Sequence, residues 1–467
     1  MARTTAAAAA LLLAGCSLAP RYQRPAAPVP EEWGAGAGAT AGPATAAGLG
    51  WREVFQDPRL QAIIALALEN NRDLRVAALN VELTGAQYRI QRAPLLPAAS
   101  ASASATRQRI AADLSSTGEP ATATNYTVGL GVTAFELDLF GRVRSLSDAA
   151  LEQYLAGEEA RRSVHLSLVG AVATQVLALR ALDDQVALAR RTLEAVESSA
   201  ALTRRTFEAG RTSELDVRTA EAQVQTARFN LSSALLQRDR AEHALVLLVG
   251  RPLPADLPPA RPLDAQALVA DLPAGLPSEV LLRRPDVLAA EHALRSANAV
   301  IGAARAAFLP SISLTAFGGT SSAELSGLFG AGSGLWSFTP QITLPLFRGG
   351  ALLAGLDAAH VRKAIQVARY EQAIQGAFCE VADALVARAA FEEQLEAQRA
   401  RVQAEQRRYE LSELRYAKGV DSYLVLLTAQ RDLFTARQLL IQSQLARLTN
   451  LVDLYRALGG GWVERSG

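Results

Sequence analysis

The chain has 467 residues, a formal net charge of +1, and a composition that is 50% hydrophobic but only 6% aromatic. A balanced charge gives no electrostatic reason to expect nucleic acid as a partner. The apolar residues are mostly alanine and leucine, which favour long packed helices over a bulky aromatic core.

The first sixteen residues, MARTTAAAAALLLAGC, have the plan of a secretion signal: a basic residue, a short apolar run and then small residues. Their last four, LAGC, resemble the lipobox of bacterial lipoproteins. This resemblance implies that residues 1–15 are removed and that Cys16 carries a diacylglycerol and an N-linked acyl chain. Because Ser17 follows, and not the aspartate associated with inner-membrane retention, the implied destination is the outer membrane. The alternative is an ordinary signal peptide with a chance cysteine.

The mature chain begins with a segment, residues 16–50, that is rich in proline, glycine and alanine and predicts a lipidated, flexible tether. We expect ordered structure to begin near Trp51. Most of the remaining chain consists of two similar sequence repeats. For example, Pro97 matches Pro310 at an offset of 213 residues. The predicted segments are a first structural repeat at 51–250, an inter-repeat linker at 251–284, a second repeat at 285–460 and a tail at 461–467.

Period-two alternation predicts strands near residues 100–109, 126–134, 311–316 and 336–346. In the last of these, Trp, Phe, Pro, Ile and Leu alternate with Ser, Thr and Gln. A half-buried soluble sheet gives the same period, but small uncharged polar faces and the lipoprotein signal favour a membrane barrel. We expect no spanning helix in the mature chain, and four strands are too few to close a barrel, since the smallest need about eight. Several chains must then share one barrel.

An uninterrupted helical pattern runs from about residue 142 to residue 208, and a matching one follows the last predicted strand. At 1.5 Å per residue, the first would form a rod about 100 Å long. Each ends at a glycine that suits a left-handed helix end, and each glycine is followed by polar residues that suit the cap of a second helix. The same turn, offset by 209 residues, therefore predicts two helical hairpin tips. The tip residues are Gly210, Ser213, Gly419, Asp421 and Ser422.

The motifs LAGC, FLPSISL, LPLFRGG, RYAKGVDSYLVLLTAQRDLF and LYRALGGGW together resemble the TolC-like outer membrane factors, among them the lipid-anchored OprM/NodT type. The resemblance covers essentially the whole mature chain. It implies a mainly α fold with membrane β structure, in which three chains build a twelve-stranded outer membrane β-barrel continuous with a twelve-helix periplasmic α-barrel.

The implied function is the exit duct of a tripartite efflux system, without enzymatic activity. It would conduct solutes passively from an inner-membrane pump, of RND type, that is joined to the duct by a periplasmic adaptor protein. The resemblance implies contacts with outer membrane lipid but none with nucleic acid, and no cofactor or metal besides the lipid on Cys16.

The resemblance also implies a periplasmic aperture near the hairpin tips, with adaptor contacts at the tips themselves. In this comparison Arg415 and Tyr416 match a pair that links neighbouring helices, and Asp216 matches an acidic partner. Leu424 matches an apolar constriction, and Thr428 stands where relatives often have a pore-facing aspartate. Loss of that aspartate predicts weaker cation selectivity. The alternative is that these are merely solvated tip residues.

Three rival functions remain open at this point. A duct for protein secretion, of the type I class, would have nearly the same sequence features. A periplasmic lipoprotein made of coiled-coil rods would share the helices but would conduct nothing. An enzyme is the weakest of the three, since no catalytic constellation is recognisable.

Overall fold

The structure, a computed structural model, describes residues 17–30, 33, 49–116, 118–266, 268, 281–462 and 464. Cys16 and the signal peptide lie outside the described residues. The chain divides into two compact units, each built from separated stretches. Unit 1 comprises Met1–Ala26, Asn80–Glu158 and Ala289–Tyr370, and unit 2 comprises Ala27–Leu79, Glu159–Leu288 and Glu371–Gly467.

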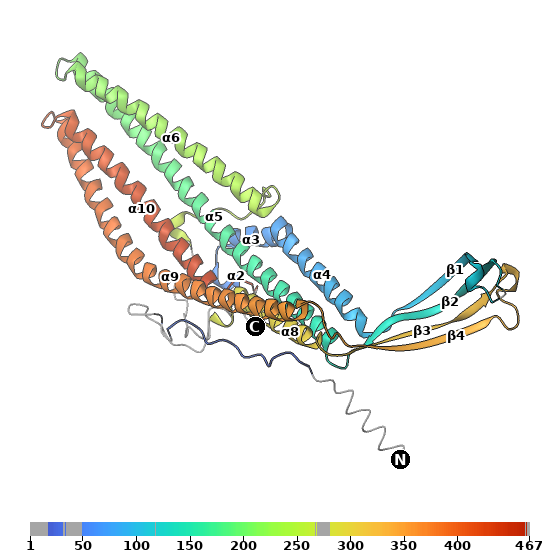
Figure 1. Cartoon of the computed structure of the whole chain (residues 1–467). Coiled ribbons are helices and arrows are strands. Elements are labelled where there is room, and N and C mark those ends of the chain that lie inside the picture. Colours follow the sequence, from blue (N-terminus) through green and yellow to red (C-terminus); the bar gives the residue numbers. More distant parts are fainter. Residues whose placement is uncertain are drawn as a thin grey trace. The chain divides into compact units, whose positions relative to one another are not determined.

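Unit 1 contains a four-stranded antiparallel sheet in the order β1-β2-β3-β4 (Figure 1). The predicted strands are all present, although three of them are longer than expected. Their bounds are Ala99–Ile110 for β1, Ala121–Leu137 for β2, Ser311–Ser322 for β3 and Gly334–Thr343 for β4. Since β1 and β4 are the outer strands, each has one edge without a partner strand in the described sheet.

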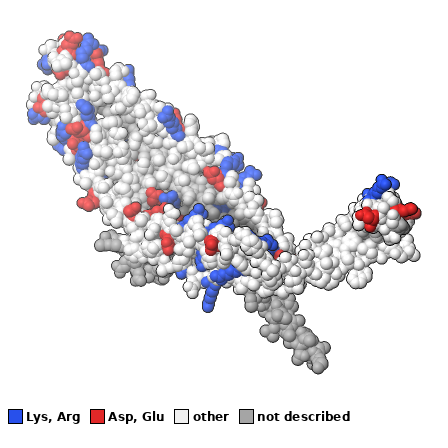
Figure 2. Space-filling model, in the orientation of Figure 1, with Lys and Arg blue, Asp and Glu red and all other residues white. Residues whose placement is uncertain are grey.

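The register of the sheet sorts its side chains onto an apolar face and a polar face. Ala101 pairs with Leu130, and Ile312 pairs with Ile342, on the apolar face. A register shift between Val132 and Phe135 marks a bulge, after which the apolar alternation resumes. Charged side chains gather at the far end of the strands and leave the drawn face of the sheet between them uncharged (Figure 2). The alternation expected from the sequence is therefore confirmed.

One aromatic side chain, Phe317, lies on the polar face. It pairs with Gly131, and a Cβ atom placed on Gly129 would lie 2.5 Å from the Phe317 ring. Glycine is required here because the ring occupies the space that any side chain would need. An aromatic ring laid over strand glycines also covers their exposed backbone.

The segment that follows Cys16 packs against the part of helix α8 (Pro285–Ala306) that belongs to unit 1. The side chain of Asn298 donates to the Pro20 carbonyl at 2.7 Å, and Glu291 accepts hydrogen bonds from Tyr22 and Arg24. The prediction of a flexible tether is therefore wrong for residues 17–26. Trp33, farther along in unit 2, is buried as well, with its ring stacked on that of Phe378 at 5.2 Å.

Helices make up most of the remaining chain, in the order that the sequence predicts (Figure 1). Two of them have 67 residues each, and the first has the same limits as the predicted rod. The helices other than α8 are α2 (Trp51–Val54), α3 (Pro58–Asn70), α4 (Arg72–Arg92), α5 (Arg142–Glu208), α6 (Glu214–Val249), α9 (Ala351–Ala417) and α10 (Tyr423–Ala457).

In unit 2, α5 and α6 form one hairpin and α9 and α10 form the other (Figure 1). Val196 of α5 is fully buried against Val224 and Ala227 of α6, with Leu193 packed beside them. The face of α5 that carries Leu193 and Val196 therefore forms part of the contact within the first hairpin.

The helices correct the expectation about membrane-spanning segments, and they contain one exposed cysteine. An 18-residue window of α5 has a mean hydropathy of 1.5 and is by length and composition able to cross a membrane, contrary to the expectation of no such segment. Because 56% of that window is buried inside the protein, its apolarity also matches a core helix. A lone cysteine in a helix is usually a small buried residue, but Cys379 is exposed.

Candidate functional site

The two hairpin tips of unit 2 have matching backbone geometry. Gly210 and Gly419 have φ angles of +72° and +75°. The amide of Arg211 donates to the Thr206 carbonyl at 2.9 Å, and the amide of Val420 donates to the Arg415 carbonyl at the same distance. This is the hydrogen bond that closes a helix through a left-handed residue. No atom lies within 4 Å of a Cβ placed on either glycine, so the positive φ angle is the reason for glycine here.

The two tips differ in how the second helix is capped. At the first tip, Ser213 and Asp216 form a reciprocal capping box at the start of α6. At the second, Ser422 is the N-cap of α10 but makes no side-chain capping hydrogen bond. Instead, Asp421 accepts two hydrogen bonds from Arg415, at 2.7 and 2.8 Å. These bonds lower the pKa of Asp421.

The pairing of Arg415 with Asp421 corrects the expected role of Asp216 within one chain. The Asp216 carboxylate accepts from the Ser213 hydroxyl at 2.9 Å, while the Arg415 guanidinium is taken up by Asp421. Each charge therefore stabilises its own turn, and neither links the two hairpins within the described chain. A contact between Asp216 and an arginine of another copy stays a prediction.

Tyr416, by contrast, does link the hairpins. It is 7% exposed, and its hydroxyl lies 2.8 Å from that of Thr203 on α5. Because the Thr203 hydroxyl donates to the Ser199 carbonyl, it accepts the proton of Tyr416. Within one chain, Tyr416 therefore joins α9 of the second hairpin to α5 of the first.

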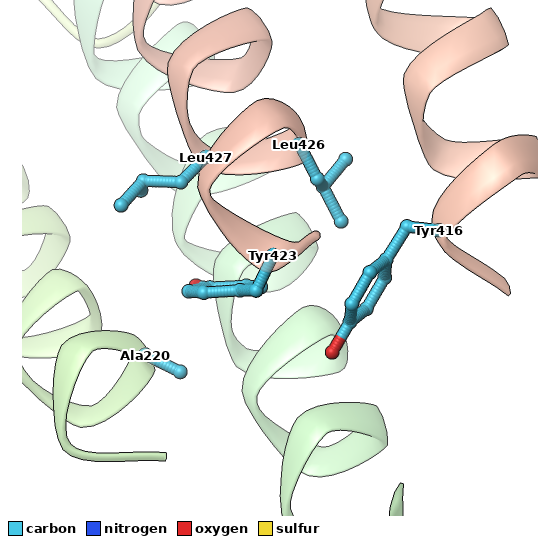
Figure 3. Packing of buried hydrophobic residues seen from close by; sticks show 5 residues of the cluster. All are labelled: Ala220, Tyr416, Tyr423, Leu426 and Leu427. Carbon is cyan, nitrogen blue, oxygen red and sulfur yellow. The ribbon is translucent and has the colours of Figure 1, made fainter. Parts of the chain in front are cut away.

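Tyr416 belongs to a buried cluster that brings the two hairpins together (Figure 3). Its ring and that of Tyr423 lie 5.7 Å apart at a tilt of 58°. Burial, the nearby Tyr416 and the charge of Asp216 raise the pKa of Tyr423 to about 12, so its hydroxyl is protonated at neutral pH. The cluster consists of Ala220, Tyr416, Tyr423, Leu426 and Leu427.

The opposite face of α10 is exposed and carries two of the five predicted aperture residues, Leu424 and Thr428. Leu424 is 66% exposed, and the exposed Thr428 donates its hydroxyl to the Leu424 carbonyl at 2.8 Å. Arg431 is exposed one turn farther along the same face. The sequence motifs did not single out Arg431, although its spacing of three from Thr428 places both on one side of the helix.

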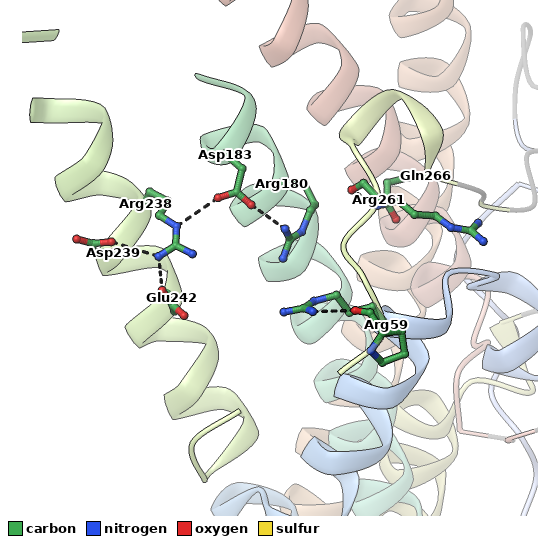
Figure 4. Close-up of polar contacts among 9 residues, drawn as sticks. Arg59, Arg180, Asp183, Arg238, Asp239, Glu242, Arg261 and Gln266 are labelled. Carbon is green, nitrogen blue, oxygen red and sulfur yellow. Dashed lines mark hydrogen bonds and ion pairs between the residues drawn. The ribbon is translucent and has the colours of Figure 1, made fainter. Parts of the chain in front are cut away.

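Away from the tips, the first hairpin is held by ion pairs between its two helices (Figure 4). Asp183 of α5 binds Arg180 of the same helix at 2.7 Å and Arg238 of α6 at 3.2 Å. Arg59 of α3 donates to the Pro258 carbonyl at 2.8 Å, which attaches the chain after α6 to the same unit. Ion pairs also join the helices of the second hairpin, where Arg408 of α9 binds Asp432 of α10 at 2.7 Å and Arg447 of α10 binds Glu392 of α9 at 2.6 Å.

The contacts at the tips are caps, an ion pair and a packed cluster. Among the described residues, no group of three or more His, Cys, Asp or Glu side chains could hold a metal ion. The tip residues make local caps, one hydroxyl link between hairpins and an exposed face with an apolar, a neutral polar and a cationic side chain. Such a set of contacts can hold two hairpins together and present a surface to solutes.

Comparison with known proteins gives a consistent result across nearly the whole chain. The family model described as "Outer membrane efflux protein" matches residues 63–251 and 276–460. The "Probable efflux pump outer membrane protein TtgC" of Pseudomonas putida is 51% identical over 464 residues, covering 99% of this chain and 96% of that relative. "Outer membrane protein OprJ" of Pseudomonas aeruginosa is 46% identical, with coverage of 97% and 95%.

A solved structure agrees in fold as well as in sequence. The open state of the Neisseria gonorrhoeae MtrE outer membrane channel superimposes with a TM-score of 0.88 at 43% identity, covering 97% of this chain and 100% of that one. These matches confirm the resemblance drawn from the sequence motifs. The chain belongs to the outer membrane efflux protein family, whose role is that of a non-enzymatic channel in the outer membrane.

Proposed function

We propose that three copies of this chain form the outer membrane exit duct of a tripartite efflux system, anchored by lipid on Cys16. The observation that carries the trimer is the open sheet of unit 1. Its outer strands β1 and β4 each leave an unpaired edge in the described chain, and the four strands are too few to close a transmembrane barrel. Pairing β4 of one copy with β1 of the next satisfies both edges, and three copies give twelve strands.

The polar face of the sheet then lines the barrel and the apolar face contacts lipid. Solutes reach the duct from an inner-membrane pump, of RND type, through a periplasmic adaptor that engages the two hairpin tips. The matching turns at Gly210 and Gly419 support this role, because they present two similar surfaces to a partner. The exit duct itself performs no energy-consuming step.

The aperture in this proposal is formed by the exposed face of α10. Leu424 supplies an apolar constriction, and Thr428 with Arg431 supplies a rim that has a cation and no carboxylate on these positions. A ring of three arginines in the assembled trimer disfavours cations near the opening. The duct should therefore be less cation-selective than relatives with an aspartate at the position of Thr428.

Single-channel recording on the purified protein in planar bilayers tests both parts of the proposal. Thr428→Asp should shift the reversal potential toward cation selectivity, because it adds three negative charges to the rim. Arg431→Gln should shift it in the same direction by removing three positive charges, and Thr428→Asn serves as the neutral control. Strong cation preference in the unaltered protein would contradict the assignment of this face, and the absence of any current would contradict the duct itself.

A cellular experiment tests which class of solute the duct carries, small compounds or polypeptides. A deletion strain should become more susceptible to small toxic compounds while its secreted protein profile stays unchanged. The opposite pattern, with lost secretion of a polypeptide and unchanged susceptibility, would replace small-molecule efflux by protein secretion.

A further inference from the structure

The outward face of the sheet carries two arginines where its apolar band ends. β1 pairs with β2 so that Ala105 lies opposite Tyr126, Arg107 opposite Thr124, and Arg109 opposite Thr122. Because residues two apart on a strand share a face, both arginines lie on the same side of the sheet as Ala101 and Leu130. This is the apolar, lipid-facing side and not the polar one.

The depth of these arginines follows from the register. The apolar face of β2 extends from Tyr126 to Leu137, about 36 Å along the strand. At a strand tilt of about 45°, this is about 25 Å along the membrane normal, the height of the apolar band of outer membrane barrels. Arg107 and Arg109 are the next two outward-facing residues of β1 beyond that band. They therefore stand at the level of lipid headgroups.

The side of the membrane is fixed by the chain's connections. β2 leads at its other end to α5, which begins at Arg142, so the arginine end of the sheet is the end away from the periplasmic helices. There the β1–β2 connection holds Asp113 and Glu119. These acidic residues lie in the connection and not on the strand rows with the arginines, and neither guanidinium has an ion pair or hydrogen bond among the described residues.

The side chains of Arg107, Arg109, Thr122 and Thr124 form a compact site whose chemistry favours phosphate. Arg107 and Arg109 are exposed and about 7 Å apart along one strand, and the hydroxyls of Thr124 and Thr122 lie on the neighbouring strand at cross-strand contact distance. Guanidinium groups bind phosphate through paired, charge-assisted hydrogen bonds. Threonine hydroxyls add neutral donors. Two cations at this spacing fit a headgroup with two phosphates, or two neighbouring headgroups.

We infer that Arg107 and Arg109 form a binding site for the phosphate groups of the anionic glycolipid in the outer leaflet. The acyl chains of the same lipid then lie along the apolar side chains of β2 below the site, such as Tyr126 and Leu130. This continuity with the apolar band is the reason to choose a lipid over a soluble anion. The site orients the sheet in the membrane by fixing its outer rim at the phosphate level. It requires the outer membrane location but not the proposed pump or adaptor.

Native mass spectrometry of the purified full-length protein tests the inference. The probes are lipid A with two phosphates, the same lipid after enzymatic removal of both phosphates, and inorganic phosphate. The unaltered protein should retain the phosphorylated lipid at least about tenfold more strongly than the dephosphorylated one. The double variant Arg107→Gln/Arg109→Gln should lose that preference of about tenfold and retain both lipids equally.

Matched variants separate a specific site from a general effect of charge. Arg251→Gln/Arg261→Gln removes two exposed arginines outside the sheet and should leave the preference unchanged. Arg107→Lys/Arg109→Lys keeps the charge but loses the paired hydrogen bonds, so it should retain only part of the preference. Semi-native electrophoresis checks that each variant assembles as the unaltered protein does.

Three results would overturn the inference. Equal retention of both lipids by the unaltered protein needs no variant and excludes a phosphate site. Retention of the preference by the glutamine double variant places the site elsewhere. Displacement of the phosphorylated lipid by inorganic phosphate at equal concentration would assign the site to a soluble anion. Single-channel current remains a separate readout, so failure here would leave the duct function untouched.

Discussion

The hydroxyl groups of Tyr416 and Tyr423 differ in their partners although the two rings pack against each other. The hydroxyl of Tyr416 bonds to Thr203 at 2.8 Å, whereas that of Tyr423 is buried without a hydrogen-bond partner among the described residues. A buried polar group without a partner destabilises the packed state, and removing it can be neutral or stabilising. The cluster between the hairpins is therefore held less tightly than its burial alone would suggest.

The same substitution at these two tyrosines should have opposite effects. Tyr416→Phe removes a formed bond and should weaken the hairpin contact by about 1 kcal/mol, whereas Tyr423→Phe should leave it unchanged or strengthen it by up to about 1 kcal/mol. In single-channel recordings, Tyr416→Phe should lengthen the open time and Tyr423→Phe should not. Longer open times for Tyr423→Phe than for Tyr416→Phe would contradict the hydrogen-bond assignment.

The ion pair between Arg415 and Asp421 gives the second tip a dependence on pH. Hydrogen bonds from Arg415 lower the pKa of Asp421 below its usual 3.8. A lowered carboxyl pKa stabilises the folded turn above the usual value, and this stabilisation is lost as the pH falls through the lowered pKa. The pair is solvent-exposed, so its contribution is small.

Channel opening should consequently stay constant between pH 7 and pH 5 and rise only below about pH 4. Asp421→Asn should open more readily at every pH in this range, with a weaker rise in acid. Single-channel recording over this pH series makes the comparison. A midpoint near pH 6 in the unaltered protein would assign the response to a group other than Asp421.

At the scale of the elements, the contact between the N-terminal segment and α8 depends on one carboxylate side chain. Glu291 has a side chain that is only 3% exposed, and it binds Arg24 at 2.8 Å and Arg295 at 2.7 Å. Burial alone would raise the pKa of Glu291, but the hydrogen bonds from Arg24 and Arg295 lower it. The carboxylate therefore stays charged at neutral pH and fixes the residues that follow the proposed lipid anchor.

Glu291→Gln should release this segment from α8. The amide lacks the charge that holds two guanidinium groups, and the loss should cost about 1 to 3 kcal/mol. Trypsin should then cleave after Arg21 or Arg24 faster than in the unaltered protein. Glu464→Gln is the matched control, because Glu464 pairs with Arg52 and not with residues 17–26, and the side chain of Glu464 is 63% exposed. Equal cleavage rates for Glu291→Gln and the control would contradict a fixed segment.

The contact made by residues 17–26 could not be read from the sequence, and the reason is physical. Their proline- and alanine-rich composition correctly indicates an extended chain, but the groups that fix it lie on α8, and Arg24 and Glu291 are 267 positions apart. The turns at the hairpin tips were predictable because their signal is local: a glycine at the end of each long helix, followed within three residues by polar residues. Within one chain Asp216 bonds to the nearby Ser213, and its contact with another copy stays a prediction.

At the scale of the whole molecule, the four strands and the two hairpins are the parts that the sequence predicts best. The alternation along strands and the periodicity of the long helices can be read from a single chain, because each pattern shows which face of the element is buried and which contacts water. The partners of the β1 and β4 edges are absent from any single chain, so the closed barrel is inferred from those open edges. What the exposed side of α10 with Arg431 faces is likewise not given by a single chain.

The claim on which the function depends is that identical copies share one hollow duct. Electron cryo-microscopy of the full-length protein, extracted in detergent, measures this directly. We expect threefold particles with a closed barrel in which β4 of each copy pairs with β1 of the next, and with the side chains of Ser313 and Thr339 facing the water-filled interior. Monomeric particles, or a barrel with those two side chains facing the detergent, would contradict it.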